Sequence, residues 1–195
     1  MWKTLLFGLG ALVVGAALGL GSAWMAVSRL SLSGRIIDGG WTTNLNTGAT
    51  TADPYTRAAV ARDGLLALAR TETVYFTRFT DDQGAPLDAA CIYRIKGRDL
   101  PARWWSVTLY DQEQYLSRNE DGAHSIDATR VTRTGDGYEA TVSATRGDAA
   151  NWLSARNAGK FSLSLRLYNP DPEVQGDPGK AVLPTVEKVS CAGGA

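Results

Sequence analysis

The sequence predicts an all-β protein, a β-sandwich or jelly roll with one short amphipathic helix, which follows an N-terminal transmembrane helix. Residues 4–27 contain no charged side chain and are long enough to cross a hydrocarbon layer of about 30 Å as a helix. From residue 71 onward, apolar and polar residues alternate in several short runs, which is typical of strands with one buried face. Gly, Pro, Asp and Asn separate these runs, as expected for turns.

The N-terminal segment, residues 1–28, is interpreted as an uncleaved signal-anchor that crosses a membrane once. A secretory signal has an apolar region of roughly 7–15 residues, and the apolar run here is longer. The alternative is cleavage close to Trp24, after a run of small residues. With the anchor retained, we expect the lipid bilayer to be a partner of this protein through residues 4–27.

Residues 29–52 are rich in Ser, Gly, Thr and Asn and are therefore predicted to be a tether. One short strand is expected around residues 36–37. Trp41 is expected to anchor this segment by packing on the surface of the domain. Residues 53–195 are predicted to form a single jelly-roll-like sandwich.

The domain is expected to begin with a helix over residues 53–70. Asp53 is a preferred N-cap residue and Pro54 suits the first helical position. Beyond this helix the alternating pattern predicts strands at about residues 71–80, 88–97, 103–111, 128–134, 138–145, 161–168 and 182–190. Together with the short strand around residues 36–37, the expected total is seven or eight strands.

The run "RWWSVTLYD" at residues 103–111 places two tryptophans side by side. Neighbouring side chains of a strand point to opposite faces, so Trp105 enters the core and Trp104 faces away from it. Trp104 therefore either lies under a covering loop or forms an exposed surface that holds a ligand.

The residues that face away from the core supply a candidate ligand-binding set. Flat aromatic surfaces combined with a few polar groups are typical of carbohydrate or small-ligand sites. The candidates are Trp104, Tyr110, Asn119, Asn151, Trp152, Arg166 and Tyr168.

A structural role for the same residues is the alternative. Aromatic side chains also cover the open ends of a sandwich, and Asn119 and Asn151 can cap turns by bonding to local backbone groups. Arg166 can form an ion pair with Asp99 or Asp111.

Charge and composition exclude several classes of function. Lys3, Arg29 and Arg35 precede the domain, which leaves 17 basic residues against 20 acidic ones. Nucleic acid is therefore not expected as a partner, because phosphate binding requires a basic patch. We expect no metal site, no nucleotide and no other cofactor, because neither ligand clusters nor glycine-rich fingerprints are present.

The sequence offers two routes to catalysis. His124 is the single histidine, and a hydrolytic triad would need it to lie between a carboxylate and a serine on a sharp turn. Asp111 and Glu113 at the end of the tryptophan strand could act as paired acids in glycoside hydrolysis. Acids at strand ends are usually solvated turn residues, so no catalytic residue is assigned.

The two cysteines, Cys91 and Cys191, allow two interpretations. An even number of cysteines behind an export signal favours a disulfide. Two buried free thiols are the alternative, since cysteine is also a common core residue.

Several motifs in a fixed order resemble a known bacterial family. They are "DPYTRAAVARDGLLAL", "CIYRIKGRDLPARWWSVTLYD", "NWL" at 151–153, "FSLSLRLYNPDP" and "LPTVEKVSC". Together they resemble the domain-of-unknown-function family numbered 1214, over nearly all of residues 53–191. The resemblance implies a jelly-roll sandwich, in the short membrane-anchored version of the family rather than the larger two-domain one. It also supports pairing of Cys91 with Cys191, and it implies no catalytic residues.

We therefore expect an uncharacterised envelope protein held in the bacterial cytoplasmic (inner) membrane by one span, with its C-terminal domain on the periplasmic side. The expected function is a non-catalytic binding or interaction module for a glycan, a lipid or an envelope protein. The alternative is a hydrolase that acts on an envelope glycan or lipid.

Overall fold

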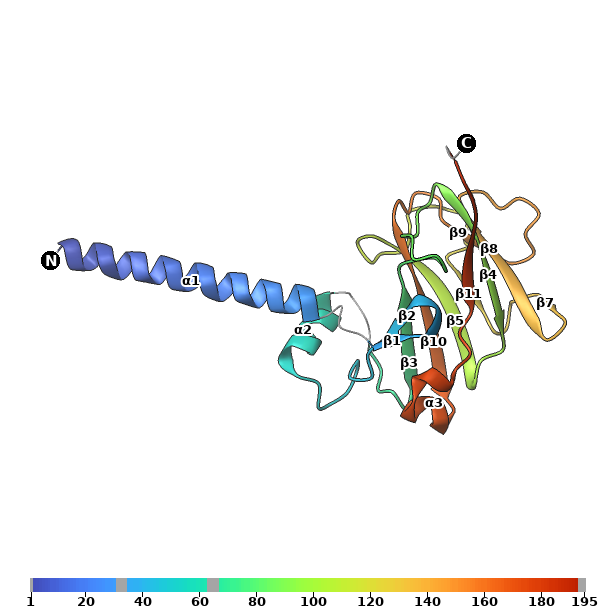
Figure 1. Ribbon diagram of the computed structural model, residues 1–195, viewed down its shortest axis with the longest axis horizontal. Helices are drawn as coiled ribbons and strands as arrows, with labels where there is room; N and C mark the ends of the chain where they lie inside the picture. Colours follow the sequence, from blue (N-terminus) through green and yellow to red (C-terminus); the bar gives the residue numbers. More distant parts are fainter. Residues whose placement is uncertain (1, 31–34, 63–66, 193–195) are drawn as a thin grey trace.

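The computed structural model describes residues 2–30, 35–62 and 67–192. Helix α1 (Trp2–Leu30) extends away from the rest of the molecule (Figure 1). Its segment Trp2–Val27 has a mean hydropathy of 2.0 and is 0% buried, so by length and composition it can cross a membrane. The predicted N-terminal helix is thus present, and its apolar segment is exposed.

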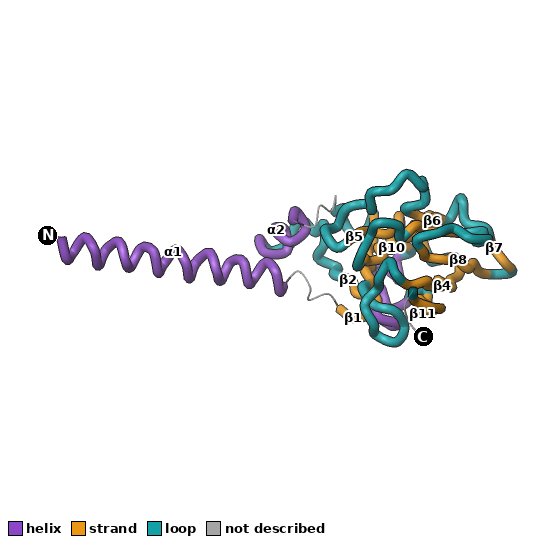
Figure 2. Tube along the Cα trace, turned by 90° about the horizontal axis from the view of Figure 1, so that it is seen from above, coloured by secondary structure: helices purple, strands orange, loops and turns teal. Residues whose placement is uncertain are grey.

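Two β-sheets pack face to face and confirm the predicted β-sandwich (Figures 1 and 2). The six-stranded sheet has the order β1-β2-β3-β10-β5-β6 and comprises β1 (Arg35–Ile37), β2 (Trp41–Thr43), β3 (Thr73–Arg78), β10 (Phe161–Pro170), β5 (Ala102–Asp111) and β6 (Ser125–Asp127). The second sheet has the order β11-β4-β8-β7 and comprises β11 (Thr185–Cys191), β4 (Cys91–Arg98), β8 (Gly137–Ser143) and β7 (Arg133–Thr134). Strand β9 (Trp152–Ser154) pairs with β8 in parallel.

The core lies between the sheets, where the alternating patterns place it. In β10, Leu163, Leu165 and Leu167 are all 0% exposed. Aromatic pairs join the sheets: Trp105 of β5 stacks on Tyr138 of β8 with ring centroids 4.8 Å apart. Such contacts bury large apolar areas and stabilise the association of the two sheets.

The short strand expected around residues 36–37 is present as β1. Strands β1 and β2 pair with each other, and β2 pairs with β3, so these two strands extend the six-stranded sheet. The placement of Trp41 on the surface was wrong, because Trp41 is 0% exposed. Its indole Nε1 donates a hydrogen bond of 2.7 Å to the carbonyl oxygen of Pro184, and this contact satisfies its polar atom inside the core.

Helix α2 (Pro54–Arg62) is shorter than the helix predicted over residues 53–70. Asp53 caps it as expected, since its Oδ1 accepts hydrogen bonds from the backbone N–H groups of Tyr55 and Thr56. Residues 63–66 lie outside the described part, and residues 67–69 are not helical. Helix α2 lies beside the end of α1 (Figures 1 and 2).

The strand expected over residues 128–134 is interrupted. Strand β6 ends at Asp127, a turn follows, and β7 starts at Arg133. The Asp127 carboxylate accepts hydrogen bonds from the backbone N–H groups of Thr129 and Arg130, which turns the chain and ends the strand. Beyond β10, two short helices, α3 (Pro172–Gly176) and η2 (Pro178–Lys180), lead to β11; an earlier one, η1 (Asp38–Gly40), joins β1 to β2.

The predicted disulfide is confirmed. Cys91 at the start of β4 is bonded to Cys191 at the end of β11, across a sequence separation of 100 residues. The bond ties the last strand of the chain to the middle of the second sheet.

Candidate functional site

The candidate site is the outer face of the six-stranded sheet, which points away from the second sheet. Strands β5 and β10 are adjacent there, and their register places Trp104 opposite Tyr168 and Ser106 opposite Arg166. Strand β3 borders β10 and places Tyr75 opposite Arg166. The outer face thus includes Thr73, Tyr75, Thr77, Trp104, Ser106, Thr108, Tyr110, Ser162, Ser164, Arg166 and Tyr168.

Arg166 lies near the centre of the outer face and is half-buried. Its Nη2 donates a hydrogen bond of 2.8 Å to the hydroxyl of Tyr110, and its Nη1 lies 3.4 Å from Oγ1 of Thr108. The guanidinium carbon is 5.3 Å from the centroid of the Tyr110 ring, within the range of a cation–π contact. All its hydrogen-bond partners among the described residues are therefore neutral hydroxyl groups.

The acids expected to neutralise Arg166 are engaged elsewhere. Asp99 forms an ion pair with Arg133, with 2.7 Å between its Oδ1 and Nη2 of the arginine. Oδ1 of Asp111 accepts hydrogen bonds from the backbone N–H groups of Glu113 and Tyr115. Because a guanidinium has five N–H donors in a planar fork, Arg166 retains the capacity to bind a carboxylate or a phosphate.

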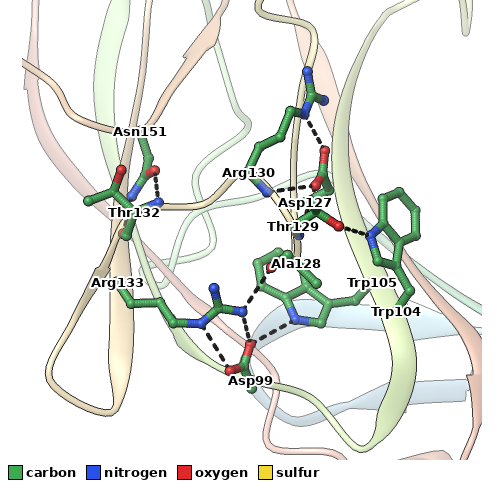
Figure 3. Close-up of polar contacts among 10 residues, drawn as sticks. All are labelled: Asp99, Trp104, Trp105, Asp127, Ala128, Thr129, Arg130, Thr132, Arg133 and Asn151. Atoms are coloured by element: carbon green, nitrogen blue, oxygen red, sulfur yellow. Dashed lines mark hydrogen bonds and ion pairs between the residues drawn. The ribbon is translucent and has the colours of Figure 1, made fainter.

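Trp104 and Trp105 lie on opposite sides of β5 (Figure 3). Trp105 is 1% exposed, whereas Trp104 is half-buried on the outer face. The ring of Trp104 lies 5.2 Å from that of Tyr168 at an angle of 55°, and its Nε1 donates a hydrogen bond of 2.9 Å to Oγ1 of Thr129. Trp104 is thus held by its polar end and by one aromatic neighbour, while part of its ring remains accessible.

A polar network at the edge of the sheet positions Trp104 (Figure 3). Asp127 is 3% exposed, and burial by itself would raise the pKa of its carboxyl. Hydrogen bonds from the Arg130 side chain and from the backbone N–H groups of Arg130 and Thr129 outweigh this effect and lower the pKa below its usual value. The charged Asp127 thus fixes the turn that carries Thr129, the partner of Trp104.

Asp99 supports the neighbouring tryptophan in the same network. It accepts hydrogen bonds from both Arg133 and Nε1 of Trp105. The bond from Arg133 is the main cause of its lowered pKa, burial opposes it, and the indole N–H of Trp105 adds to it. Sequence reasoning missed the role of Asp127 and Thr129, although an Asp directly after an apolar strand residue is a recognisable turn signal.

The other three predicted ligand residues do not join the outer face. Asn151 is 7% exposed and exchanges hydrogen bonds with both backbone groups of Thr132, as drawn in Figure 3 for the bond to its N–H. Nε1 of Trp152 donates to Ser143. The side chain of Asn119 bonds to Ser117 and to the carbonyl of Arg156. All three hold loops and the second sheet together.

The family model described as "Protein of unknown function (DUF1214)" matches residues 72–172. The chain belongs to the DUF1214 family. The matched range runs from the start of β3 to the start of α3 and includes the β3, β5 and β10 residues of the outer face, whereas α1, β1, β2 and β11 lie outside it. No curated protein matches.

The solved structures similar to this DUF1214 chain include two uncharacterised or unassigned bacterial proteins. The VPA0106 protein from Vibrio parahaemolyticus has 22% sequence identity and a TM-score of 0.58, over 70% of this chain and 35% of the other. An uncharacterised protein from Burkholderia cenocepacia has 18% identity and a TM-score of 0.48, over 60% of this chain and 30% of the other. The likeness to the Vibrio protein supports the fold, and this DUF1214 chain matches about a third of that protein's length.

The outer face of the second sheet of the DUF1214 module is different in character. Arg94 lies 3.1 Å from Glu139 and 3.6 Å from Glu187, and Lys96 lies 3.7 Å from Glu187. Alternating charges of this kind are typical of a solvent-facing sheet surface. The face that carries Arg166, by contrast, combines hydroxyl groups and aromatic rings with a cation whose described partners are neutral.

Among the described residues of the DUF1214 module, no hydrogen bond joins the side chains of the candidate catalytic residues His124, Asp111 and Glu113 to one another. Asp111 closes the turn after β5 through its two backbone contacts. The Nδ1 atom of His124 is buried and has no hydrogen-bond partner in the described part of the chain. Across residues 2–30, 35–62 and 67–192, no group of three His, Cys, Asp or Glu side chains is arranged to hold a metal ion.

Proposed function

We propose that this DUF1214 protein is a single-pass protein of the bacterial inner membrane whose sandwich domain lies on the periplasmic side. The apolar helix α1 supports the membrane anchor. The Cys91–Cys191 disulfide supports an oxidising compartment, because structural disulfides persist mainly outside the cytoplasm.

We propose further that the domain is a non-catalytic binding module and that the outer face is its binding surface. The observation that carries this proposal is Arg166, a half-buried cation bonded to the neutral hydroxyls of Tyr110 and Thr108. The ligand would present a carboxylate or a phosphate to Arg166, and a flat or apolar part to Trp104 and Tyr168. Acidic glycans, lipid headgroups and acidic segments of envelope proteins have this chemistry.

A calorimetric titration tests the proposal. The full chain is placed in nanodiscs of phosphatidylcholine and titrated with oligogalacturonate, a carboxylated glycan, and with glycerol phosphate. The Arg166→Gln variant is expected to lower the association constant of the probe that binds by at least about tenfold, the order of a lost charged hydrogen bond.

Arg98→Gln is the matched control, because Arg98 is an exposed arginine of the other sheet, paired with Asp136. Retained affinity in this control, together with loss in Arg166→Gln, supports the outer face as the binding surface. Equal affinity in both variants, or no binding of either probe by the wild-type chain, would reject the proposal.

A further inference from the structure

The connection between the membrane helix and the sandwich is short. Helix α1 ends at Leu30 and β1 begins at Arg35, so five Cα steps join them. At about 3.3–3.6 Å per residue, a fully extended connection spans less than about 20 Å. A connection of this length keeps the β1 edge of the six-stranded sheet close to the end of α1.

Three large apolar side chains are exposed near one end of the outer face. Phe79 is 44% exposed, Tyr115 is 69% exposed and Leu116 is 46% exposed. Arg78 pairs with Leu163 in the antiparallel register of β3 and β10. Phe79 comes directly after Arg78, so it lies beside Ser162, and both are on the outer side of the sheet.

The loop that carries Tyr115 and Leu116 folds back toward the same end of the sheet. Nε2 of Gln114 lies 3.5 Å from Oγ of Ser162, and Ser162 is only 1% exposed. We call Phe79, Tyr115 and Leu116 the apolar rim of the outer face.

The part of the rim after β5 is held by a well-defined turn. The backbone N–H of Asp111 donates to the carbonyl of Tyr115 at 2.8 Å, and the N–H of Tyr115 donates to Oδ1 of Asp111 at 2.9 Å. These reciprocal bonds close the turn and hold Tyr115 outward at little further cost in conformational entropy. In Figure 1 the loop after β5 projects from the side of the sandwich from which α1 extends.

We propose that the apolar rim is a second contact with the bilayer that holds α1, so that the outer face is turned toward the lipid headgroups. This inference rests on the membrane anchor of the proposed function. Tyrosine is enriched at the membrane–water interface, and Phe and Leu enter the boundary between headgroups and acyl chains. Because the domain beyond residue 35 carries more acidic than basic residues, burial of apolar area rather than net charge drives the contact. Arg166 then lies opposite the phosphate groups of the lipids.

Nitroxide accessibility tests the orientation. The label is attached at Leu116→Cys in the full chain with its native disulfide, reconstituted into phosphatidylcholine nanodiscs. The matched control is Val189→Cys, an exposed apolar position (49%) on β11 of the second sheet. Relaxation by oxygen is expected to exceed relaxation by a water-soluble nickel complex at position 116, and the reverse is expected at position 189. The Phe79→Ser, Tyr115→Ser double substitution is expected to return the label at 116 to water.

Two results would overturn the inference. A label at 116 that is as accessible to nickel as the label at 189 means that the rim does not contact lipid. Dipolar broadening between labels at 116 in one disc assigns the rim to a second copy of the chain instead. Binding of soluble probes that still depends on Arg166 in either case would leave the proposed binding function intact, so the two failures are distinguishable.

Discussion

The ring of Tyr138 lies over Gly97 on the neighbouring strand, and a Cβ atom built on Gly97 would lie 2.6 Å from the tyrosine hydroxyl. The two residues are direct partners in the register of β4 and β8. The tyrosine continues from there into its stack with Trp105 of the opposite sheet. The absence of a side chain at Gly97 is therefore what allows an aromatic pair to bridge the two sheets.

Gly97→Ala is expected to destabilise the domain, because the methyl group would displace Tyr138 from its stack. Overpacking of this kind costs about 1–3 kcal/mol, to be measured as a lowered free energy of unfolding in urea. Gly176→Ala is the control, since nothing lies within 4 Å of its Cβ position, and it should leave the free energy of unfolding nearly unchanged. Equal stability of the two variants would contradict the packing described for Tyr138.

Two buried tyrosines should respond in opposite ways to removal of the hydroxyl. The hydroxyl of Tyr138 has no hydrogen-bond partner in the described residues, whereas that of Tyr93 accepts a bond of 2.9 Å from the backbone N–H of Asp88. Tyr138→Phe should therefore leave the free energy of unfolding unchanged or raise it by up to about 1 kcal/mol, and Tyr93→Phe should lower it by about 1–2 kcal/mol. Thermal unfolding of both variants, followed by near-ultraviolet circular dichroism, decides the comparison. A larger loss in Tyr138→Phe than in Tyr93→Phe would show that the Tyr138 hydroxyl is bonded.

Replacement of both Cys91 and Cys191 by alanine should destabilise the sandwich without changing its fold. The bond closes a loop of 100 residues, and loss of a native disulfide typically costs about 2–5 kcal/mol. Urea unfolding of the wild-type chain with and without reductant gives the same comparison without mutation. Unchanged stability on reduction would mean that the bond does not constrain the chain.

Acid should destabilise the domain through Asp127 and Asp99. Both have pKa values lowered in the folded state, Asp127 by hydrogen bonds that outweigh its burial and Asp99 mainly by the bond from Arg133. A lowered folded pKa adds stability above the unfolded value of about 3.9, and this stability is lost as the pH falls through the folded value. The Tm of the wild-type chain should thus decrease as the pH drops below about 4, and the decrease should be smaller in Asp127→Asn. An identical pH profile for Asp127→Asn would remove Asp127 from the account.

The sequence predicted the strands best where apolar and polar residues alternate strictly. In residues 161–168 every second side chain is apolar, and the structure places all of that set in the core. Trp41 was misplaced because it stands alone among polar residues, and the partner that buries it, Pro184, is 143 residues away. The interrupted strand after Asp127 was missed because two backbone hydrogen bonds to one carboxylate outweigh the alternation.

The candidate site was predictable in part for the same reason. Alternation places Trp104, Tyr110, Arg166 and Tyr168 off the core, and their meeting depends only on β5 lying next to β10. Asn151 and Trp152 have the same composition of polar and aromatic groups, yet they belong to the second sheet and its edge. Which strands are neighbours is a property of long-range pairing, which local patterns do not encode.

The most direct test of the outer face uses the tryptophans as reporters. The full chain is labelled with 5-fluorotryptophan in phosphatidylcholine nanodiscs, and its fluorine resonances, assigned by single Trp→Phe substitutions, are followed while carboxy-PROXYL, an anionic nitroxide, is added. A neutral nitroxide corrects for simple exposure. We predict that the anion broadens Trp104 more than Trp152, which is also half-buried, and that Arg166→Gln removes the difference. Equal broadening of Trp104 and Trp152, unaffected by Arg166→Gln, would contradict an anion-binding surface at Arg166.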